Sequence, residues 1–225
     1  MAGTAKSPLR LAVLDVDGTL KQAESPYAYL HERLGLGHLA AEHRSLALAG
    51  RISYGEWLRR DVALWRGQPV SHLAALLAAN PYLPGALDFV AALKRAGIRV
   101  ALVSAGFTLN TDPVAADLCA DDVLANELGV VDGVLDGTAV NRVPEGGKGA
   151  FVRALMARHD IAPEETLAAG DTHGDLELFE HASVRLAVNP RSAELRARAT
   201  AVFEPDLVGA VAWLVQQGYL AAAGD

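Results

Sequence analysis

The fold is decided by one stretch near the start of the chain, Leu11-Ala12-Val13-Leu14-Asp15-Val16-Asp17-Gly18-Thr19-Leu20. An apolar run that ends in a turn signal is typical of a short buried strand. Asp15 and Asp17 come where this strand ends, and residues two apart along a strand point the same way. Two carboxylates held together repel each other unless they share a proton or bind a cation. The stretch therefore predicts a buried strand that leads into an acidic site.

Short apolar segments alternate with amphipathic segments along the rest of the chain. Strands are expected over Leu9–Val16, Ile98–Ser104, Asp122–Ala125, Thr166–Gly170 and Val184–Val188. Helices are expected over Gly85–Ala96, Leu109–Leu118, Lys148–Arg158, Leu176–Glu180, Ser192–Ala199 and Asp206–Gly218. This alternation predicts an α/β fold, a doubly wound parallel sheet with helices on both faces.

One long stretch, residues 25–80, interrupts the alternation with helical patterns alone. Ser53 and Glu56 have the spacing of a capping box, and Trp57 and Trp65, eight residues apart, share a helix face that is expected to pack in a core. We therefore expect a core domain of residues 1–22 and 81–225 with an inserted helical cap domain of residues 23–80. A second irregular stretch, residues 126–147, contains Asp132-Gly133 between apolar residues, which predicts a hairpin.

Composition narrows the class of protein. The chain has 225 residues, of which 51% are hydrophobic, enough to bury a large core. Its formal net charge is −7 without a cluster of basic residues, which argues against nucleic acid as a partner. The single cysteine, Cys119, allows no disulfide within the chain and is expected to be a buried small apolar residue. Because no signal peptide or membrane span is recognisable, we expect a cytoplasmic protein.

Four separated motifs carry side chains that could take part in catalysis or ligand binding. They are Asp15–Thr19, Val103–Phe107 with the hydroxyl of Ser104, Gly146–Gly149 with Lys148, and Ala169–Asp175 with Asp171 and Asp175. Three of the four follow predicted strands, and ligands bind at the carboxyl ends of strands in open α/β sheets. We therefore expect the four motifs to meet along one edge of the sheet.

The residue types in these motifs suit one kind of chemistry. Carboxylate oxygens of Asp15, Asp17 and Asp171 are ligands that Mg²⁺ prefers. Ser104, Lys148 and the backbone N–H groups that follow Thr19 and Ser104, that of Ala105 included, suit a phosphoryl group. One carboxylate can attack phosphorus, and a second can protonate the leaving oxygen and then deprotonate water. The motifs therefore predict metal-assisted phosphoryl transfer.

Taken together and in this order, the four motifs resemble those of the haloacid dehalogenase superfamily of phosphohydrolases. The resemblance implies that Asp15 is the nucleophile, that Asp17 is the general acid and base, and that Ser104 and Lys148 hold the phosphoryl oxygens. An Asp at position 17 is typical of the phosphatases of this superfamily rather than its dehalogenases. The implied Mg²⁺ site consists of Asp15, the backbone carbonyl of Asp17, Asp171 and Asp175.

The helical insertion is similar to the cap of the phosphoserine-phosphatase-like branch. Glu24, nine residues after Asp15, matches an acidic cap residue of that branch. Asp61 stands where phosphoserine phosphatases have the arginine that pairs with the substrate carboxylate, and the adjacent Arg60 points about 100° around the helix. An acidic group cannot replace arginine in that role. The resemblance therefore implies the reaction, on a small phosphorylated metabolite, and the acidic pair favours a leaving group with an amine or several hydroxyls.

Each of these residues also has a plainer interpretation. Taken singly, Ser104 is a helix N-cap, Lys148 is a surface lysine, and Asp171 and Asp175 are loop carboxylates that cap the following helix. Glu24 and Asp61 are then solvated residues of the insertion.

The histidines carry no metal-ligand spacing. His31, His38 and His43 are therefore expected on the surface of the insertion. His173 lies inside the fourth motif, where it is either a surface residue or a neighbour of the leaving group.

Three other functions compete with that of a phosphatase. A phosphotransferase would pass the phosphoryl group from Asp15 to an alcohol. A phospho-acceptor domain that resembles a response-regulator receiver would also pair carboxylates with Ser104 and Lys148, but it would lack the insertion. A non-catalytic binding protein would not need the whole set of acidic and basic residues. The sequence indicates no oligomeric state.

Overall fold

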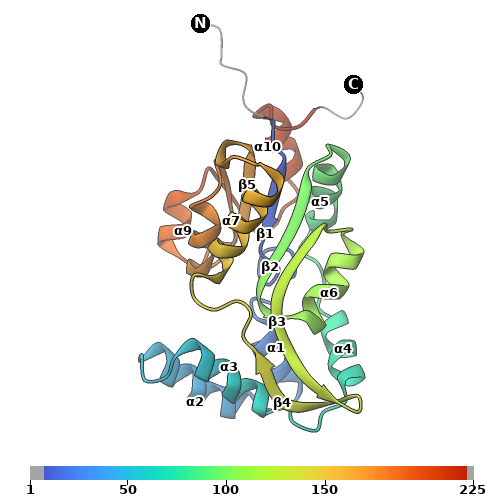
Figure 1. Ribbon diagram of the computed structural model, residues 1–225, viewed down its shortest axis with the longest axis vertical. Helices are drawn as coiled ribbons and strands as arrows, with labels where there is room; N and C mark the ends of the chain where they lie inside the picture. The colour runs from blue at the N-terminus through green and yellow to red at the C-terminus, as the bar shows by residue number, and fades with distance from the viewer. Residues whose placement is uncertain (1–7, 222–225) are drawn as a thin grey trace, which may run out of the picture.

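A seven-stranded sheet forms the centre of the computed structural model, which describes residues 8–221 (Figure 1). The strand order is β4-β3-β2-β1-β5-β6-β7, and every neighbouring pair is parallel except β3 and β4. The strands are β1 (Leu11–Leu14), β2 (Arg99–Phe107), β3 (Asp122–Val131), β4 (Val134–Val140), β5 (Thr166–Gly170), β6 (Val184–Val188) and β7 (Ala201–Phe203). The predicted α/β fold is confirmed. The expectation of no signal peptide, which concerns residues 1–8, lies almost wholly outside the described residues.

Helices cover both faces of the sheet, which explains why β1 is apolar at every position. Leu11 and Val13 point to one face and pack with residues of α7 (Gly147–His159), α8 (Leu176–Phe179) and α9 (Ala193–Arg198). Ala12 and Leu14 point to the other face and pack with residues of α5 (Ala86–Arg95), α6 (Thr108–Asp117) and α10 (Ala210–Gln216). Residues buried on both faces read as a continuous apolar run, as observed.

The sheet has a switch point at β1. From β1 the chain builds β2 on one side, and it later returns to place β5 on the other side. Loops that leave the carboxyl ends of adjacent strands diverge at such a point and leave a crevice between them. The motifs after β1 and β5 therefore border one crevice.

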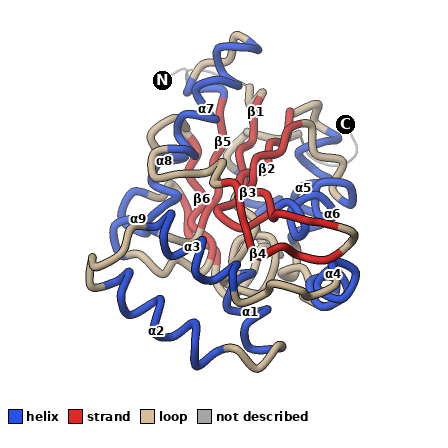
Figure 2. The backbone as a smooth tube through the Cα atoms, turned by 60° about the horizontal axis from the view of Figure 1, so that its bottom comes forward, coloured by secondary structure: helices blue, strands red, loops and turns tan. Residues whose placement is uncertain are grey.

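The remaining four helices are α1 (Pro26–Arg33), α2 (Gly37–Leu48), α3 (Tyr54–Ala63) and α4 (Val70–Ala78). They gather at one end of the molecule beside the β3–β4 hairpin (Figure 1). Their apolar cluster includes Trp65, as predicted, and extends to Phe107 of β2 and Leu135 of β4. Backbone hydrogen bonds from Gly67 and Val70 to the hairpin fix this packing. Helix α2 has no buried residue, and it lies on the outside of this group (Figure 2).

Several element boundaries differ from the prediction. Strand β2 continues to Phe107, so Ser104 lies inside an irregular part of the strand rather than at its end. The hairpin at Asp132-Gly133 is confirmed, but its strands extend over most of the stretch expected to be irregular. The short edge strand β7 was not predicted.

The prediction for Cys119 is wrong, because its side chain is exposed. Cys119 follows α6 with φ of 51°, the left-handed conformation in which helices commonly end, so it turns away from the core. Within residues 8–221, no helix is both long and apolar enough to cross a membrane.

Candidate active site

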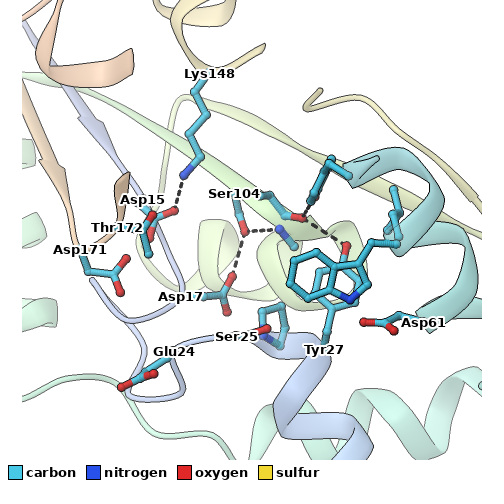
Figure 3. Close-up of a pocket in the computed structure, with 16 residues that line it drawn as sticks. Asp15, Asp17, Glu24, Ser25, Tyr27, Asp61, Ser104, Lys148, Asp171 and Thr172 are labelled. Atoms are coloured by element: carbon cyan, nitrogen blue, oxygen red, sulfur yellow. Dashed lines mark hydrogen bonds and ion pairs between the residues drawn. The ribbon is translucent and has the colours of Figure 1, made fainter. Parts of the chain in front are cut away.

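Asp15 follows β1 directly and lies buried at the centre of the site (Figure 3). Its Oδ1 accepts a hydrogen bond from Nζ of Lys148 at 2.7 Å, and its Oδ2 accepts one from the hydroxyl of Thr19 at 3.0 Å. The same Nζ donates to Oδ1 of Asp175 at 2.6 Å. Lys148 lies in the first turn of α7 and is only 7% exposed. Its interpretation as a surface lysine is therefore wrong.

Asp17 makes a separate set of contacts. Ser104 Oγ donates to one oxygen of Asp17, and Asn110 Nδ2 donates to the other, both at 2.8 Å. The Ser104 Oγ itself accepts from the backbone N–H of Gly106. Ser104 therefore does not cap α6, whose N-cap residue is Phe107. The structure thus places the Ser104 hydroxyl of the second motif against the Asp17 carboxylate of the first motif.

The loop after β5 brings Asp171 and Asp175 to the same place. Oδ2 of Asp171 accepts from Arg191 Nε at 3.0 Å and lies 2.8 Å from Nη2 of the same guanidinium. Asp171 also packs against Gly18, whose φ is +84° and where any side chain would overlap the Asp171 carboxylate. Oδ2 of Asp175 accepts from the backbone N–H groups of Asp171 and Thr172, so Asp175 shapes the loop rather than capping α8.

Three of these carboxylates form a donor set for a metal ion. Asp15, Asp171 and Asp175 each offer an oxygen, and these oxygens all lie within 4.8 Å of one another. When all three are ionised, their combined negative charge exceeds the positive charge of Lys148 and Arg191, which contact them. Hard oxygen donors with excess negative charge fit a divalent cation such as Mg²⁺. The Asp17 side chain is instead engaged by Ser104 and Asn110.

Burial makes these acids costly to ionise. Burial raises the pKa of Asp17 to about 6, although the hydrogen bonds from Ser104 and Asn110 oppose the shift. Burial also raises the pKa of Asp15 and of Asp171, and neighbouring carboxylates add to both shifts. Burial lowers the pKa of Lys148, but its ion pairs with Asp15 and Asp175 outweigh this effect and hold the pKa above its usual value. Perturbed acids of this kind are typical of catalytic sites.

A cavity of about 290 Å³ opens beside Asp15 and Asp17. Residues of the sheet edge line it together with Tyr27, Tyr54 and Trp57 from α1 and α3. Figure 3 shows Tyr27 and Asp61 on the side away from Lys148 and Asp171. Trp57 therefore faces the cavity rather than the apolar cluster that holds Trp65, contrary to prediction. Ala105 also lines the cavity, and the hydroxyls of both tyrosines donate to its carbonyl at 3.2 and 2.9 Å.

The two acidic residues of the insertion differ from each other. Glu24 is exposed, and its carboxylate lies 2.6 Å from Arg191. Asp61 is only 4% exposed, so it is not a solvated residue. Its Oδ1 lies 2.8 Å from Nδ1 of His43, and burial raises its pKa while the contact with His43 opposes the shift.

The expectation that the insertion histidines lie on the surface is wrong for two of them. His31 is buried with Nε2 3.4 Å from the carbonyl oxygen of Asp61, and His43 contacts the Asp61 carboxylate. His38 is exposed, as expected. His173 is also exposed, does not line the cavity and lies 3.6 Å from Glu194.

Sequence reasoning missed Asn110 and Arg191. Both follow strands of the parallel sheet by three residues, Asn110 after β2 and Arg191 after β6. The rule that ligands bind at the carboxyl ends of strands was a usable signal for both. Neither residue belongs to a recognisable motif, and so neither was singled out.

Comparisons with known proteins agree on the family. Residues 12–180 match the family described as haloacid dehalogenase-like hydrolase. The chain is 33% identical over 192 residues to phosphoserine phosphatase SerB2 of Mycobacterium tuberculosis, covering 85% of this chain and 47% of that protein. It is 34% identical over 186 residues to phosphoserine phosphatase of Idiomarina loihiensis, covering 81% of this chain and 83% of that protein. The chain spans about half the length of several curated relatives that it matches.

A solved structure described as a phospho-aspartyl intermediate analogue of phosphoserine phosphatase superposes with a TM-score of 0.80. It is 25% identical, and the match covers 92% of this chain and 99% of that one. The match spans both the sheet and the helical insertion, since little of either chain is left out. The chain therefore belongs to the haloacid dehalogenase-like hydrolases, as a phosphoserine-phosphatase-like member of that family.

Proposed function

We propose that this chain is a Mg²⁺-dependent phosphatase that hydrolyses a small phosphomonoester through an aspartyl-phosphate on Asp15. The observation that carries the proposal is the arrangement of two buried carboxyl groups with separate partners. Asp15 is held by Lys148 and Thr19, whereas Asp17 is held by Ser104 and Asn110. Two acids in different environments can take different roles, one as nucleophile and one as proton carrier.

The metal ion would be held by carboxylate oxygens of Asp15, Asp171 and Asp175 together with the backbone carbonyl of Asp17. When bound, Mg²⁺ supplies positive charge against the phosphoryl oxygens. The proposal assigns residues 23–80 as a cap that closes the site from the side opposite the sheet, in line with the cavity walls supplied by α1 and α3.

The first half of the reaction forms a bond between an Asp15 oxygen and phosphorus and breaks the bond from phosphorus to the ester oxygen. Asp17, in its acid form, donates its proton to that leaving oxygen. A buried acid with a pKa of about 6 holds such a proton in part near neutral pH. Lys148 balances the charge on Asp15, and Ser104, which lines the cavity, would turn its hydroxyl from Asp17 to donate to a phosphoryl oxygen.

In the second half, water attacks phosphorus and the bond to Asp15 breaks. Asp17 is now a carboxylate and takes the proton of the water, which restores its acid form. The products are inorganic phosphate and the free alcohol. Relatives of this chain carry the name phosphoserine phosphatase, and the proposal extends only their reaction to it, on a small phosphorylated metabolite.

The test is release of phosphate from 4-nitrophenyl phosphate and from a panel of alkyl phosphates at fixed Mg²⁺. We expect multiple turnovers, loss of activity in a chelator and recovery with Mg²⁺ but not with Ca²⁺, which prefers more ligands at longer distances. Activity that chelation leaves unchanged would refute the metal role. Added alcohols identify a phosphotransferase, because free phosphate then falls while a new phosphomonoester appears. A stable phosphoprotein without turnover would instead indicate a phospho-acceptor domain.

A further inference from the structure

The far wall of the active-site cavity is built from one face of helix α3. Tyr54, Trp57, Leu58 and Asp61 all line the cavity, and their spacing of three, four and seven residues places them on one side of the helix. Arg60 is not among the lining residues, and its Nε donates to Glu56 at 2.8 Å on the outer side. The wall that faces the leaving group is therefore aromatic and apolar, with a carboxylate at its end (Figure 3).

The charges around the cavity are unequally distributed. Among the described residues that line it, Lys148 is the only Lys or Arg, and it is held by Asp15 and Asp175 at the phosphate end. Glu24 also lines the cavity, and it shares the guanidinium of Arg191 with Asp171. Within residues 8–221, Asp61 contacts no lysine or arginine; the polar groups beside it are His43, whose Nδ1 lies 2.8 Å from its carboxylate, and His31, whose Nε2 lies 3.4 Å from its carbonyl oxygen. Among the residues of α3 that line the cavity, Asp61 thus supplies a carboxyl group, and none supplies a lysine or arginine.

The aromatic side chains that line the cavity expose their rings rather than their polar atoms. The hydroxyls of Tyr27 and Tyr54 both donate to the carbonyl of Ala105. Nε1 of Trp57 is buried and has no hydrogen-bond partner among the described residues. Ring faces next to a carboxylate attract an organic cation, since the π-electrons and the charge act in the same direction.

We infer that the preferred phosphomonoester has an amino-alcohol leaving group, whose ammonium or quaternary ammonium nitrogen lies between the aromatic wall and Asp61. This inference rests on the proposed function and names the substrate class of the same site. It assigns Asp61 as a specificity-determining residue. A leaving group that carries a carboxylate is disfavoured, because it would meet Asp61 without an available cation in this cavity.

A second cavity beside the first contains basic residues that could favour an anionic leaving group instead. This cavity of about 700 Å³ shares Glu24, Tyr27, Trp57 and Asp61 with the first and is also lined by Arg44, which is exposed on α2. An anionic leaving group that extends into this second cavity would meet Arg44 and Arg191, although Asp61 lines it as well. The substrate comparison must therefore include an anionic compound.

The test compares phosphomonoesters of matched shape at fixed Mg²⁺. Phosphoethanolamine is compared with n-propyl phosphate, and phosphocholine with 3,3-dimethylbutyl phosphate, while O-phosphoserine and phosphoglycolate supply the anions. We expect kcat/KM to be at least about tenfold higher for each cation than for its neutral counterpart, and lowest for the anions. Equal or higher values for the neutral or anionic compounds would overturn the inference.

Variants locate the preference. Asp61→Asn keeps the size of the side chain, and it is expected to reduce the ratio of cationic to neutral kcat/KM to about one, mainly through KM. Asp88→Asn removes an exposed carboxylate on α5 and is expected to leave the ratio unchanged. If Asp61→Asn does not fold, Trp57→Leu replaces it and is expected to lower the phosphocholine ratio.

Hydrolysis of the aryl phosphate tests the phosphatase activity separately from the preference for an amino-alcohol leaving group. Hydrolysis of 4-nitrophenyl phosphate without a preference for cations would refute the amino-alcohol inference alone. Failure to hydrolyse any phosphomonoester would refute the proposed function and the inference with it.

Discussion

The edge of the sheet and the helical insertion both contain buried charged groups, but they hold them differently. At the sheet edge, Asp15 and Asp171 are far apart in sequence and meet because they follow β1 and β5, adjacent parallel strands that end together. In the insertion, Asp61 and His43 come from neighbouring helices and meet through packing alone. The comparison teaches that a regular sheet positions chemical groups by its geometry, whereas a group of short helices positions them by side-chain fit.

The largest loss of activity is expected when the proposed nucleophile at the sheet edge is replaced. Asp15→Asn is expected to lower kcat by roughly 10⁵-fold or more, the scale seen when a covalent nucleophile is removed. The fold is expected to persist, because the amide keeps the size of the carboxylate: its oxygen can accept from Lys148, and its NH2 group can donate to the hydroxyl of Thr19. Steady-state phosphate release and a circular dichroism spectrum measure the two effects. A variant with most of its activity would show that Asp15 is not the nucleophile.

Asp17→Asn is expected to have a smaller effect that depends on the leaving group. Loss of proton transfer costs roughly 10²–10⁴-fold on an alkyl phosphate. The loss should be smaller in the phosphorylation step with 4-nitrophenyl phosphate, since 4-nitrophenolate leaves without a proton. Pre-steady-state release of 4-nitrophenol compares the two substrates. Equal losses on both would assign Asp17 a structural role through Ser104 and Asn110.

Stability is expected to separate the core of the sheet from the outer helix of the insertion. Leu14→Ala on β1 empties a fully buried site and should lower the free energy of unfolding by about 2–5 kcal/mol. Leu48→Ala at the end of α2, where the side chain is 75% exposed, should change it by less than about 0.5 kcal/mol. Urea denaturation measures both. A large effect at Leu48 would reveal contacts of α2 beyond those within this chain.

A small effect on stability is also expected where the two regions meet. Glu24→Gln removes the ion pair with Arg191, in which the Glu24 side chain is 66% exposed. Exposed pairs of this kind contribute about 0–1 kcal/mol and are screened by salt. Thermal unfolding should therefore shift by no more than about 4 °C, and the shift should vanish in 1 M NaCl. A larger, salt-resistant shift would mean that Glu24 is fixed by more than this contact.

The sequence predicted the sheet edge better than the insertion, for a physical reason. The motifs that contain Asp15, Lys148 and Asp171 each lie beside a strand or helix that the sequence pattern predicts. The motifs could therefore be placed relative to one another in the fold. The surroundings of Asp61 depend on how α1, α2 and α3 cross, and no periodic pattern specifies a crossing. His43 was therefore expected at the surface although it contacts a buried carboxylate.

Two kinds of error arose within the sheet itself. The lengths of β3 and β4 were underestimated. Both strands continue beyond the parallel part of the sheet as an antiparallel hairpin, and only the turn of that hairpin has a clear sequence signal. Arg191 was overlooked because its role appears only when β6 is placed next to β5. Neither error changed the predicted fold class, since both concern the ends of elements rather than their order.

Arg191 also has a consequence for how the molecule folds. Arg191 contacts both Asp171 and Glu24, and it is 167 residues from Glu24 in the sequence. Lys148 is 133 residues from Asp15, which it also contacts. Contacts of such large sequence separation form only after long loops have closed, and they slow folding. During synthesis, Asp15 and Asp17 emerge from the ribosome well before the cations that offset the charge of the cluster. The acidic cluster therefore becomes electrostatically balanced only when the last third of the chain has been added.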